Sequence, residues 1–187
     1  MDSLHNLRIE NIDLSRIDDI TELADSETEQ QILEKIRESF SLSQKNKIIL
    51  GAFVNQKICG LIYFIFAEKR PWGSILYMKT KAPEPQIQLP VLTLLVDRCF
   101  QLAEENNCVR VYMVNNLKKR GNYDNARLYP LAKKIPRLKN YIFISESIVT
   151  ADSRPDYFYE WQMMGFQTFD HDLGIVSATR VQNEIKI

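Results

Sequence analysis

The strongest constraint on the fold of this chain is a long amphipathic stretch that lies between two strand-like segments. Apolar residues recur at intervals of three and four from Leu92 to Ala103, which is the spacing of one face of an α-helix. Residues 74–80, upstream, alternate as a strand does, and residues 109–114, downstream, form a buried strand. A strand, a loop, a helix and a strand in this order predict a βαβ crossover with two parallel strands.

Two segments further upstream, 48–54 and 58–66, predict an antiparallel hairpin. Both are rich in β-branched and aromatic residues, and they flank the short polar connection Asn55-Gln56-Lys57. Residues 74–80 then make a third antiparallel strand. The helix after them should start near Leu89, with Pro90 in its first turn, and should end around residues 106–107.

The first 44 residues predict one strand and two helices. Residues 7–12 alternate as an opening strand, and Asp13 or Ser15 can cap a helix that runs to about residue 24. A second helix is better marked, because Ser26 and Glu29 form a capping-box pattern before apolar residues at helical spacing. This helix should end near Leu42.

Beyond residue 114 the pattern is harder to interpret. Residues 115–153 contain the loop breakers Gly121, Pro130 and Pro136, and we expect an insertion with a short helix. Residues 157–164 predict a short helix that Gly165 closes, because glycine adopts the left-handed helix exit readily. Residues 167–170 and 175–180 are then expected as the final two strands.

Composition places the chain among ordinary globular proteins. It has 187 residues, of which 45% are hydrophobic and 26% charged, and this length predicts one domain over residues 1–187. The longest apolar run, residues 58–67, is shorter than the roughly 18 residues that a membrane helix needs. The first residues show no basic stretch followed by an apolar block, so no secretory signal is predicted and the cytoplasm is the expected location.

The cysteines and histidines predict no metal site. Cys59, Cys99 and Cys108 lie in apolar stretches at spacings that fit no metal or redox motif, and we interpret them as buried small hydrophobic residues. His5 and His171 join no cysteine or acidic cluster with ligand spacing. Neither pattern favours a bound metal.

The balanced formal charge hides a basic segment. Residues 118–139 contain eight Lys and Arg residues, opposed only by Asp124. They could bind the outer phosphate of a nucleotide cofactor, an acidic partner, or nucleic acid through phosphates. Nucleic acid is not expected, because no aromatic module for single strands is present. A solvated amphipathic helix explains the pattern equally well, since Leu128, Leu131, Ile135 and Leu138 recur at helical spacing.

Three motifs carry a resemblance to a known family. Lys57-Ile58-Cys59-Gly60 follows a hairpin turn, residues 78–83 end a strand at a proline, and residues 161–166, Trp-Gln-Met-Met-Gly-Phe, match an aromatic-x-x-x-Gly-Phe ending. Together with the order of the elements, they resemble the GNAT superfamily of acyl-coenzyme A N-acyltransferases over nearly the whole chain. The resemblance implies an α/β fold: a mixed sheet with antiparallel N-terminal strands, a βαβ crossover and helices on both faces.

The resemblance also implies a cofactor site for acetyl-coenzyme A or another acyl-coenzyme A, in the cleft where strand 74–80 diverges from strand 109–114. Backbone groups of Met78 and Thr80 would pair with the pantetheine arm, and the start of the long helix would meet the pyrophosphate. Asn115 or Asn116 would border the cleft. The implied pyrophosphate-binding residues are Gln86, Ile87, Gln88 and Leu89.

The pyrophosphate loop departs from the family pattern. The family has Arg/Gln-x-x-Gly-x-Gly/Ala here, because bare backbone N–H groups at a helix N-terminus must approach the phosphates. This chain has Gln86-Ile87-Gln88-Leu89-Pro90-Val91, which keeps the glutamine but contains no glycine. Bulky side chains are therefore expected to crowd the loop, and Pro90 to remove one donor.

The catalytic position departs as well. The family places a tyrosine on its last helix to protonate the departing thiolate, whereas Trp161 holds that register here and cannot supply a proton. The role would then pass to Tyr159 or its neighbour Tyr157, although packing is the alternative for an aromatic residue there. Residues 74–80 contain no carboxylate that could act as the general base, and Glu146, Glu160 and His171 are the open candidates.

Two functions follow from the sequence. The first is an acyl-coenzyme A-dependent N-acyltransferase that acts on a small-molecule or protein amine. The second is a catalytically inactive GNAT-fold module for binding or assembly, in which the basic segment 118–139 is the surface for an acidic partner. The missing glycines and the displaced tyrosine motivate the second function.

Overall fold

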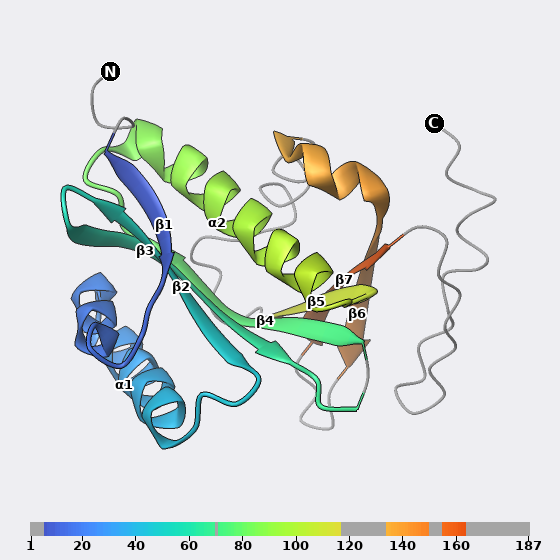
Figure 1. Cartoon of the computed structure of the whole chain (residues 1–187), viewed down its shortest axis with the longest axis horizontal. Coiled ribbons are helices and arrows are strands. Elements are labelled where there is room, and N and C mark those ends of the chain that lie inside the picture. Colours follow the sequence, from blue (N-terminus) through green and yellow to red (C-terminus); the bar gives the residue numbers. More distant parts are fainter. Residues whose placement is uncertain (1–5, 70, 117–133, 150–154, 164–187) are drawn as a thin grey trace.

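The computed structural model describes residues 6–69, 71–116, 134–149 and 155–163. Its strands form one mixed sheet in the order β1-β2-β3-β4-β5-β7-β6, in which β4 and β5 are parallel and the other neighbours are antiparallel (Figure 1). The strands are β1 Leu7–Asn11, β2 Lys47–Val54, β3 Lys57–Phe66, β4 Trp72–Thr80, β5 Arg110–Asn116, β6 Tyr141–Val149 and β7 Pro155–Met163. The predicted antiparallel strands and parallel crossover are confirmed.

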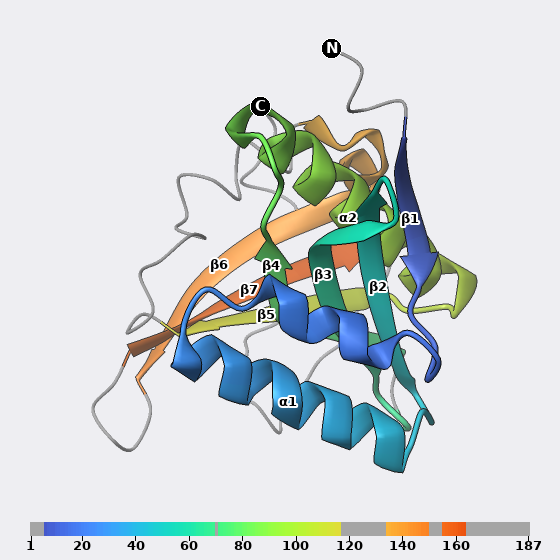
Figure 2. The ribbon, with the colours of Figure 1, turned by 90° about the vertical axis from the view of Figure 1, so that its left-hand side faces the viewer.

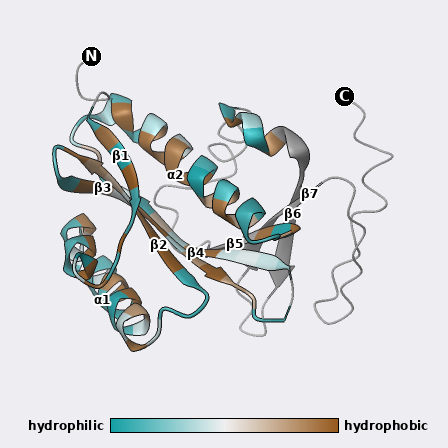
Figure 3. Ribbon diagram, in the orientation of Figure 1, coloured by the Kyte–Doolittle hydropathy of each residue, from teal (hydrophilic) through white to brown (hydrophobic). Residues whose placement is uncertain are grey.

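Helices cover both faces of the sheet. The 3-10 helix η2 (Ile17–Leu23) and α1 (Glu27–Leu42) lie on one face, and α2 (Pro85–Glu105) lies on the other, as the two views show (Figures 1 and 2). A short 3-10 helix, η4 (Pro136–Asn140), precedes β6. The central strands β2 and β3 are largely hydrophobic, whereas α1 alternates between hydrophilic and hydrophobic residues (Figure 3). This is the pattern of a sheet that is buried on both faces.

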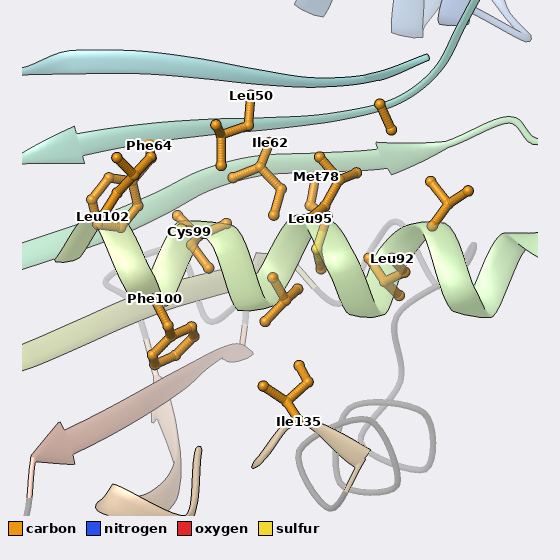
Figure 4. Close-up of a cluster of buried hydrophobic side chains, with 14 of the residues drawn as sticks. Leu50, Ile62, Phe64, Met78, Leu92, Leu95, Cys99, Phe100, Leu102 and Ile135 are labelled. Atoms are coloured by element: carbon orange, nitrogen blue, oxygen red, sulfur yellow. The ribbon is translucent and has the colours of Figure 1, made fainter. Parts of the chain in front are cut away.

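Two apolar layers hold the helices on the sheet. Leu33, Ile36 and Phe40 of α1 pack with η2 against one face. The other layer joins α2 to the strands and is the larger of the two. Figure 4 labels members of it, among them Leu50, Ile62, Phe64 and Met78 from the strands and Leu92, Leu95, Cys99 and Leu102 from α2.

Local chemistry explains where several elements start and end. The Ser26 hydroxyl accepts a hydrogen bond from the Glu29 N–H at 3.3 Å, as the predicted capping box requires. The returning bond to Glu29 Oε2 comes from the Asp25 N–H, one residue before the cap. Asn55 and Gln56 both have positive φ, of 50° and 72°, as a two-residue hairpin turn requires.

The end of α2 confirms the predicted stop at residues 106–107. Asn107 has a φ of 56°, the Cys108 N–H donates to the Ala103 carbonyl, and the Asn107 N–H donates to the Glu104 carbonyl. These two bonds are those of a Schellman motif, in which asparagine takes the place that glycine usually holds.

The structure corrects three predicted elements. First, residues 17–23 form a 3-10 helix rather than an α-helix that starts at Asp13 or Ser15. Second, α2 begins at Pro85, four residues before the expected start, because proline suits the first helical position. Third, the insertion 115–153 contains strand β6 as well as η4.

The largest correction concerns residues 157–164. Residues 157–163 belong to strand β7, which pairs with β5 on one edge and with β6 on the other, and not to a short helix. The segment Tyr-Phe-Tyr-Glu-Trp is rich in aromatic residues that favour strands, and two neighbouring strands satisfy its backbone. The predicted final strands, 167–170 and 175–180, lie outside the described residues.

Gly73 shows how tightly β4 sits in the sheet. A Cβ atom at this position would lie 2.0 Å from Phe64 Cζ, and Phe64 is fully buried. The Phe64 ring also packs edge-to-face against Phe66, with 4.9 Å between the ring centroids. The ring therefore has little room to move away from an added methyl group.

We expect Gly73→Ala to lower the free energy of unfolding by about 1–3 kcal/mol, because it overpacks the contact with Phe64. Denaturant unfolding followed by circular dichroism measures the effect. Leu42→Ala is the control, since Leu42 is 86% exposed and its loss should change stability by less than about 0.5 kcal/mol. Equal stability of Gly73→Ala and wild type would contradict the predicted packing.

Candidate functional site

Strands β4 and β5 separate halfway along their length. They pair from Trp72↔Arg110 to Ile75↔Met113, yet β4 continues to Thr80 and β5 to Asn116. The separation coincides with a β-bulge: β3 pairs Tyr63 with Tyr77 and Phe64 with Ile75, so Leu76 is the extra residue. A bulge bends a strand and increases its twist. The bulge therefore contributes to the divergence of β4 from β5.

The divergence leaves one edge of β4 without a neighbouring strand among the described residues. The Lys81 N–H donates to the Cys59 carbonyl of β3 at 2.8 Å. Because backbone groups of an antiparallel strand point alternately to its two edges, Lys79 and Tyr77 also face β3, and Met78 and Thr80 face the other edge. Within the described residues, no strand pairs with that edge beyond Ile75. The predicted positions Met78 and Thr80 therefore present backbone donors and acceptors there.

The N-terminus of α2 follows this edge after only four residues, 81–84. The helix has no side-chain cap and no acidic residue in its first turn. Its N–H groups and its dipole therefore make the N-terminus a favourable place for an anion. By contrast, Ser26 and Glu29 cap the N-terminus of α1.

The side chains of the first turn do not all point the same way. Ile87 is 4% exposed and belongs to the core between α2 and the sheet, whereas Gln86, Gln88 and Leu89 are exposed. The amide of Gln86 donates to the Glu84 carboxylate. Ile87 therefore does not occupy the outer surface of this turn.

Pro90 was expected to remove a donor from the first turn, and the structure corrects this point. Because α2 starts at Pro85, Pro90 is the sixth residue of the helix and lies in its second turn. The N–H that it lacks would have bonded inside the helix to the Gln86 carbonyl. The first turn loses a donor only at Pro85, where proline is well tolerated.

Asn115 and Asn116 lie in the part of β5 that has diverged from β4. Their backbones pair on the other side with Tyr157 and Asp156 of β7. Both residues follow Met113, the last residue of β5 that pairs with β4. Their role beside a cofactor stays a prediction.

Tyr159 lies in the middle of β7, opposite Met113 of β5 and Ser145 of β6. Met113 is also the last residue of β5 that pairs with β4, so Tyr159 is level with the point of divergence. Strand β5 separates it from β4, and neighbouring strands are about 4.8 Å apart. Tyr157, the alternative, is opposite Asn115.

The position of the last hairpin shows what the sequence interpretation missed. In the family order, the tyrosine-bearing helix precedes the final two strands. The structure describes the strands β6 and β7 within 141–163, and the segment that precedes them and follows β5 is 117–140. It contains Tyr123 and Tyr129, which lie outside the described residues. Recognition of 141–149 and 155–163 as two aromatic-rich strands would have revealed this register.

An ion network around a buried lysine lies on the other face of β4. Lys79 is 4% exposed, and its Nζ donates to Asp25 Oδ2 at 2.7 Å and to both Glu29 carboxylate oxygens at 2.8 Å. The bond from Lys79 is the main cause that lowers the pKa of Asp25. Burial acts to raise the pKa of Glu29, but the bond from Lys79 and the Asp25 N–H outweigh it and lower the pKa. Burial opposes the charge of Lys79, but the two carboxylates raise its pKa.

The end of the basic segment packs against α2. Ile135 and Leu138 are buried in the same core as the inner face of this helix. Arg137 forms ion pairs with Asp97 and Glu104 of α2, and its Nε lies 3.3 Å from Asp97 Oδ1. Lys134 is exposed. The other bases of the segment, apart from Lys139, lie outside the described residues.

The three cysteines are buried, as the sequence predicts, at 2%, 0% and 3% exposure for Cys59, Cys99 and Cys108. Burial raises the pKa of Cys59 and Cys108 to about 11 and raises that of Cys99 as well. Their thiols are therefore protonated at neutral pH and poor nucleophiles. Among the described residues, no His, Cys, Asp and Glu side chains form a metal-holding group. No helix in the described part is long and apolar enough to cross a bilayer.

Known structures show the same fold. The aminoglycoside 6'-N-acetyltransferase from Enterococcus faecium is 12% identical, with a TM-score of 0.59 over 86% of this chain and 99% of that one. PaiA N-acetyltransferase from Thermoplasma acidophilum, in complex with coenzyme A, is 15% identical, with a TM-score of 0.56 over 83% and 98%. A GNAT-family acetyltransferase from Streptococcus pneumoniae is 15% identical, with a TM-score of 0.54 over 85% and 99%.

These likenesses define the class of structure. No protein-family model matches the sequence, and no curated protein matches it either. The matched structures are acetyltransferases, and each is covered almost completely. The chain has the GNAT fold, with a sequence that has diverged widely from those of the matched structures.

We expect the three thiols to resist a thiol reagent such as Ellman's reagent at pH 8 in the folded protein and to react fully in denaturant. The reason is that burial keeps them protonated and out of contact with the reagent. Absorbance of the released thiolate measures the reaction. Stoichiometric labelling of the native protein within minutes would contradict the placement of these residues in the core.

Proposed function

We propose that the chain is an acyl-coenzyme A-dependent N-acyltransferase, which transfers an acetyl or other acyl group to an amine. The observation that supports this proposal best is the open edge of β4, which leads within a few residues to an uncapped helix N-terminus. An extended ligand with amide groups at one end and a diphosphate at the other matches both features. Coenzyme A is such a ligand.

The residues present fit this cofactor. The backbones of Met78 and Thr80 would pair with the amides of the pantetheine arm. The N–H groups of Gln86 and Gln88 would face the pyrophosphate, because these two residues are polar and exposed. Ile87 turns its side chain into the core, and its own N–H donates to the Glu84 carbonyl at 3.1 Å. Asn115 and Asn116 would border the arm from the side of β5. A loop without glycine can therefore serve, provided that the exposed glutamines and Leu89 move aside.

The chemistry that the cofactor supplies is a thioester, whose carbonyl carbon is open to attack by a neutral amine. The chain would hold the thioester at the divergence and polarise its carbonyl oxygen with backbone N–H groups of β4. A positioned acid would then protonate the thiolate that departs. The carboxylates of Asp25 and Glu29 are poor candidates for the general base, because Lys79 holds them ionised and lowers their pKa.

The acceptor is proposed only as an amine. Aminoglycosides are the acceptors named for one matched structure, and an N-acetyltransferase activity is named for another. At identities of 12–15% these names do not select a substrate for this chain. A small-molecule amine and a protein amine both remain within the proposal, and so does a cytoplasmic location.

The second function, a module that binds an acidic partner through 118–139, draws less support from the described residues. Arg137 is already paired with two carboxylates of α2, and Ile135 and Leu138 lie in the core. Of the bases in this segment, Lys134 is exposed. The hypothesis therefore depends on the rest of the segment, and it stays a prediction.

We expect the protein to bind coenzyme A, and Gln88→Glu to weaken the binding by about tenfold or more, because it adds a negative charge beside the pyrophosphate site. The same charge near a helix N-terminus should raise stability slightly, by up to about 0.5 kcal/mol. Isothermal titration calorimetry and thermal unfolding measure the two effects. A variant that binds coenzyme A more weakly but is at least as stable as wild type has lost affinity for a reason other than misfolding.

Gln101→Glu is the matched control, because it makes the same change in the last turn of the same helix. It should leave the affinity for coenzyme A unchanged and should lower stability slightly. The proposed function fails if wild-type protein binds neither free nor acylated coenzyme A at millimolar concentration. The proposed phosphate position fails if both variants bind as wild type does.

We expect loss of the acid tyrosine to lower kcat by about 10²-fold or more with little change in KM for acetyl-coenzyme A. The segment that precedes the β6–β7 hairpin makes Tyr123→Phe or Tyr129→Phe the expected site of this loss. Tyr159→Phe should retain most activity, because β5 lies between Tyr159 and β4. Thiol release with a panel of amines measures the rates. A loss confined to Tyr159→Phe would restore Tyr159 as the acid.

A further inference from the structure

The open half of β4 needs support that the sheet does not fully provide. From Tyr77 to Thr80 this strand has β3 on one side and, within the described residues, no strand on the other. A strand with a single neighbour is more easily displaced than one paired on both edges. Ligand binding along the open edge nevertheless requires backbone groups that hold a fixed position.

Two lysines of this half connect it to the opposite helical layer. Lys79 Nζ donates to Asp25 at 2.7 Å and to both oxygens of Glu29 at 2.8 Å. Lys81 Nζ donates to the carbonyls of Glu22 and Ala24 at 3.2 and 2.9 Å and lies 3.0 Å from Asp25 Oδ1. The two ammonium groups thus bind one short segment, which joins η2 to α1 beside the end of β4 (Figure 2).

The segment that receives these bonds is itself anchored. The capping box fixes its backbone, since the Glu29 N–H donates to Ser26 and the Asp25 N–H donates to Glu29. Helix η2 before it has Ile20 and Leu23 fully buried, and α1 after it has Leu33 fully buried. A displacement of Lys79 or Lys81 would therefore have to break bonds to a fixed partner.

Stability alone does not explain a buried lysine at position 79. Replacement of a buried ion pair by apolar residues of similar size is often neutral or stabilising. The neighbouring position, Met78, shows that this strand accommodates an unbranched apolar side chain on its other face. The ammonium group forms three short, directed hydrogen bonds. These bonds fix the position of the Lys79 side chain and of the backbone from which it extends.

We propose that Lys79, assisted by Lys81, is a positioning residue that holds the open half of β4 so that Met78 and Thr80 can bind the cofactor arm. Neither lysine touches the ligand in this arrangement. The inference rests on the proposed function, which supplies its ligand. The claim that Lys79 holds β4 in place concerns the free protein and needs no ligand. It assigns the junction 22–29 as the support of the binding edge.

The test compares the loss of two cations that each bridge two carboxylates, one with a buried side chain (Lys79, 5% exposed) and one with a partly exposed side chain (Arg137, 29%). Lys79→Met removes the cation between Asp25 and Glu29, and Arg137→Met removes the cation between Asp97 and Glu104 on the far side of α2. Both variants should melt at a lower temperature than wild type. Only Lys79→Met should weaken coenzyme A binding, by about tenfold or more, while Arg137→Met stays within about twofold.

Hydrogen exchange supplies a readout that needs no ligand. The amides of Lys79 and Lys81 face β3, and that of Lys81 bonds to Cys59. Lys79→Met should raise their exchange rates by about tenfold relative to the amides of the β2–β3 hairpin, and Arg137→Met should not. Lys79→Arg, which keeps the charge and several donors, should recover affinity to within about threefold of wild type.

The outcomes separate the two claims. If wild type does not bind coenzyme A, the proposed function fails. The hydrogen-exchange rates still test whether Lys79 fixes the position of β4. Unchanged exchange at Lys79 and Lys81 in Lys79→Met overturns the positioning role whatever the ligand. So does an equal loss of affinity in Arg137→Met. If Lys79→Met does not fold, Lys81→Met provides the same comparison, since Lys81 is 43% exposed and should be easier to replace.

Discussion

The close approach of α2 to the sheet is the contact on which the remaining structure depends. A Cβ atom at Gly60 of β3 would lie 2.8 Å from Leu95 Cδ1 and 2.9 Å from Val91 Cγ1, and both of these side chains are fully buried. The helix therefore rests directly on the backbone of β3. Because α2 joins β4 to β5, its position fixes where the chain leaves β4 and where it returns as a parallel strand. The N-terminus of α2 and the divergence of the two strands are both consequences of this packing.

Successive side chains of β4 point to opposite faces of the sheet, and the two faces make different contacts. Met78 is buried with α2, and the next residue, Lys79, is buried with the polar junction of η2 and α1. Apolar packing on one face excludes water from the helix side, and directed ionic bonds on the other face fix the strand. The bulge at Leu76 lies between this half and the half that pairs with β5. One strand thus combines a half that is paired on both edges with a half that, among the described residues, pairs only with β3.

The features that local residues determine were predictable from the sequence. The β2–β3 hairpin, the capping box at Ser26, the stop of α2 at Asn107 and the burial of the cysteines each depend on neighbours within a few positions, and the structure confirms them. The GNAT fold followed from their order along the chain. Once the strand is known, the alternation of backbone groups along it shows which edge Met78 and Thr80 face.

The errors arose where distant contacts decide the local structure. Residues 157–163 have an ambiguous pattern, and Gly165 suggested a helix end, but pairing with both β5 and β6 makes them a strand. A single sequence does not show which strands will flank such a segment. The wrong assignment also placed Tyr159 on a helix, whereas it lies on a strand that β5 separates from β4. The network of Lys79 was invisible for the same reason, since its carboxylates lie 50 and 54 positions away.

The absence of glycine at the start of α2 has a different meaning once the register of the helix is known. A helix that began at Leu89 would have placed Ile87 and Gln88 in a loop before the helix, close to any phosphate. Because α2 begins at Pro85, Ile87 instead joins Val91 and Leu95 at intervals of four on the buried face. The helical period thus turns Ile87 into the core and leaves Gln86, Gln88 and Leu89 exposed. Glycines are one way to expose backbone N–H groups at a helix N-terminus, and an inward-facing hydrophobic residue at the third helical position is another.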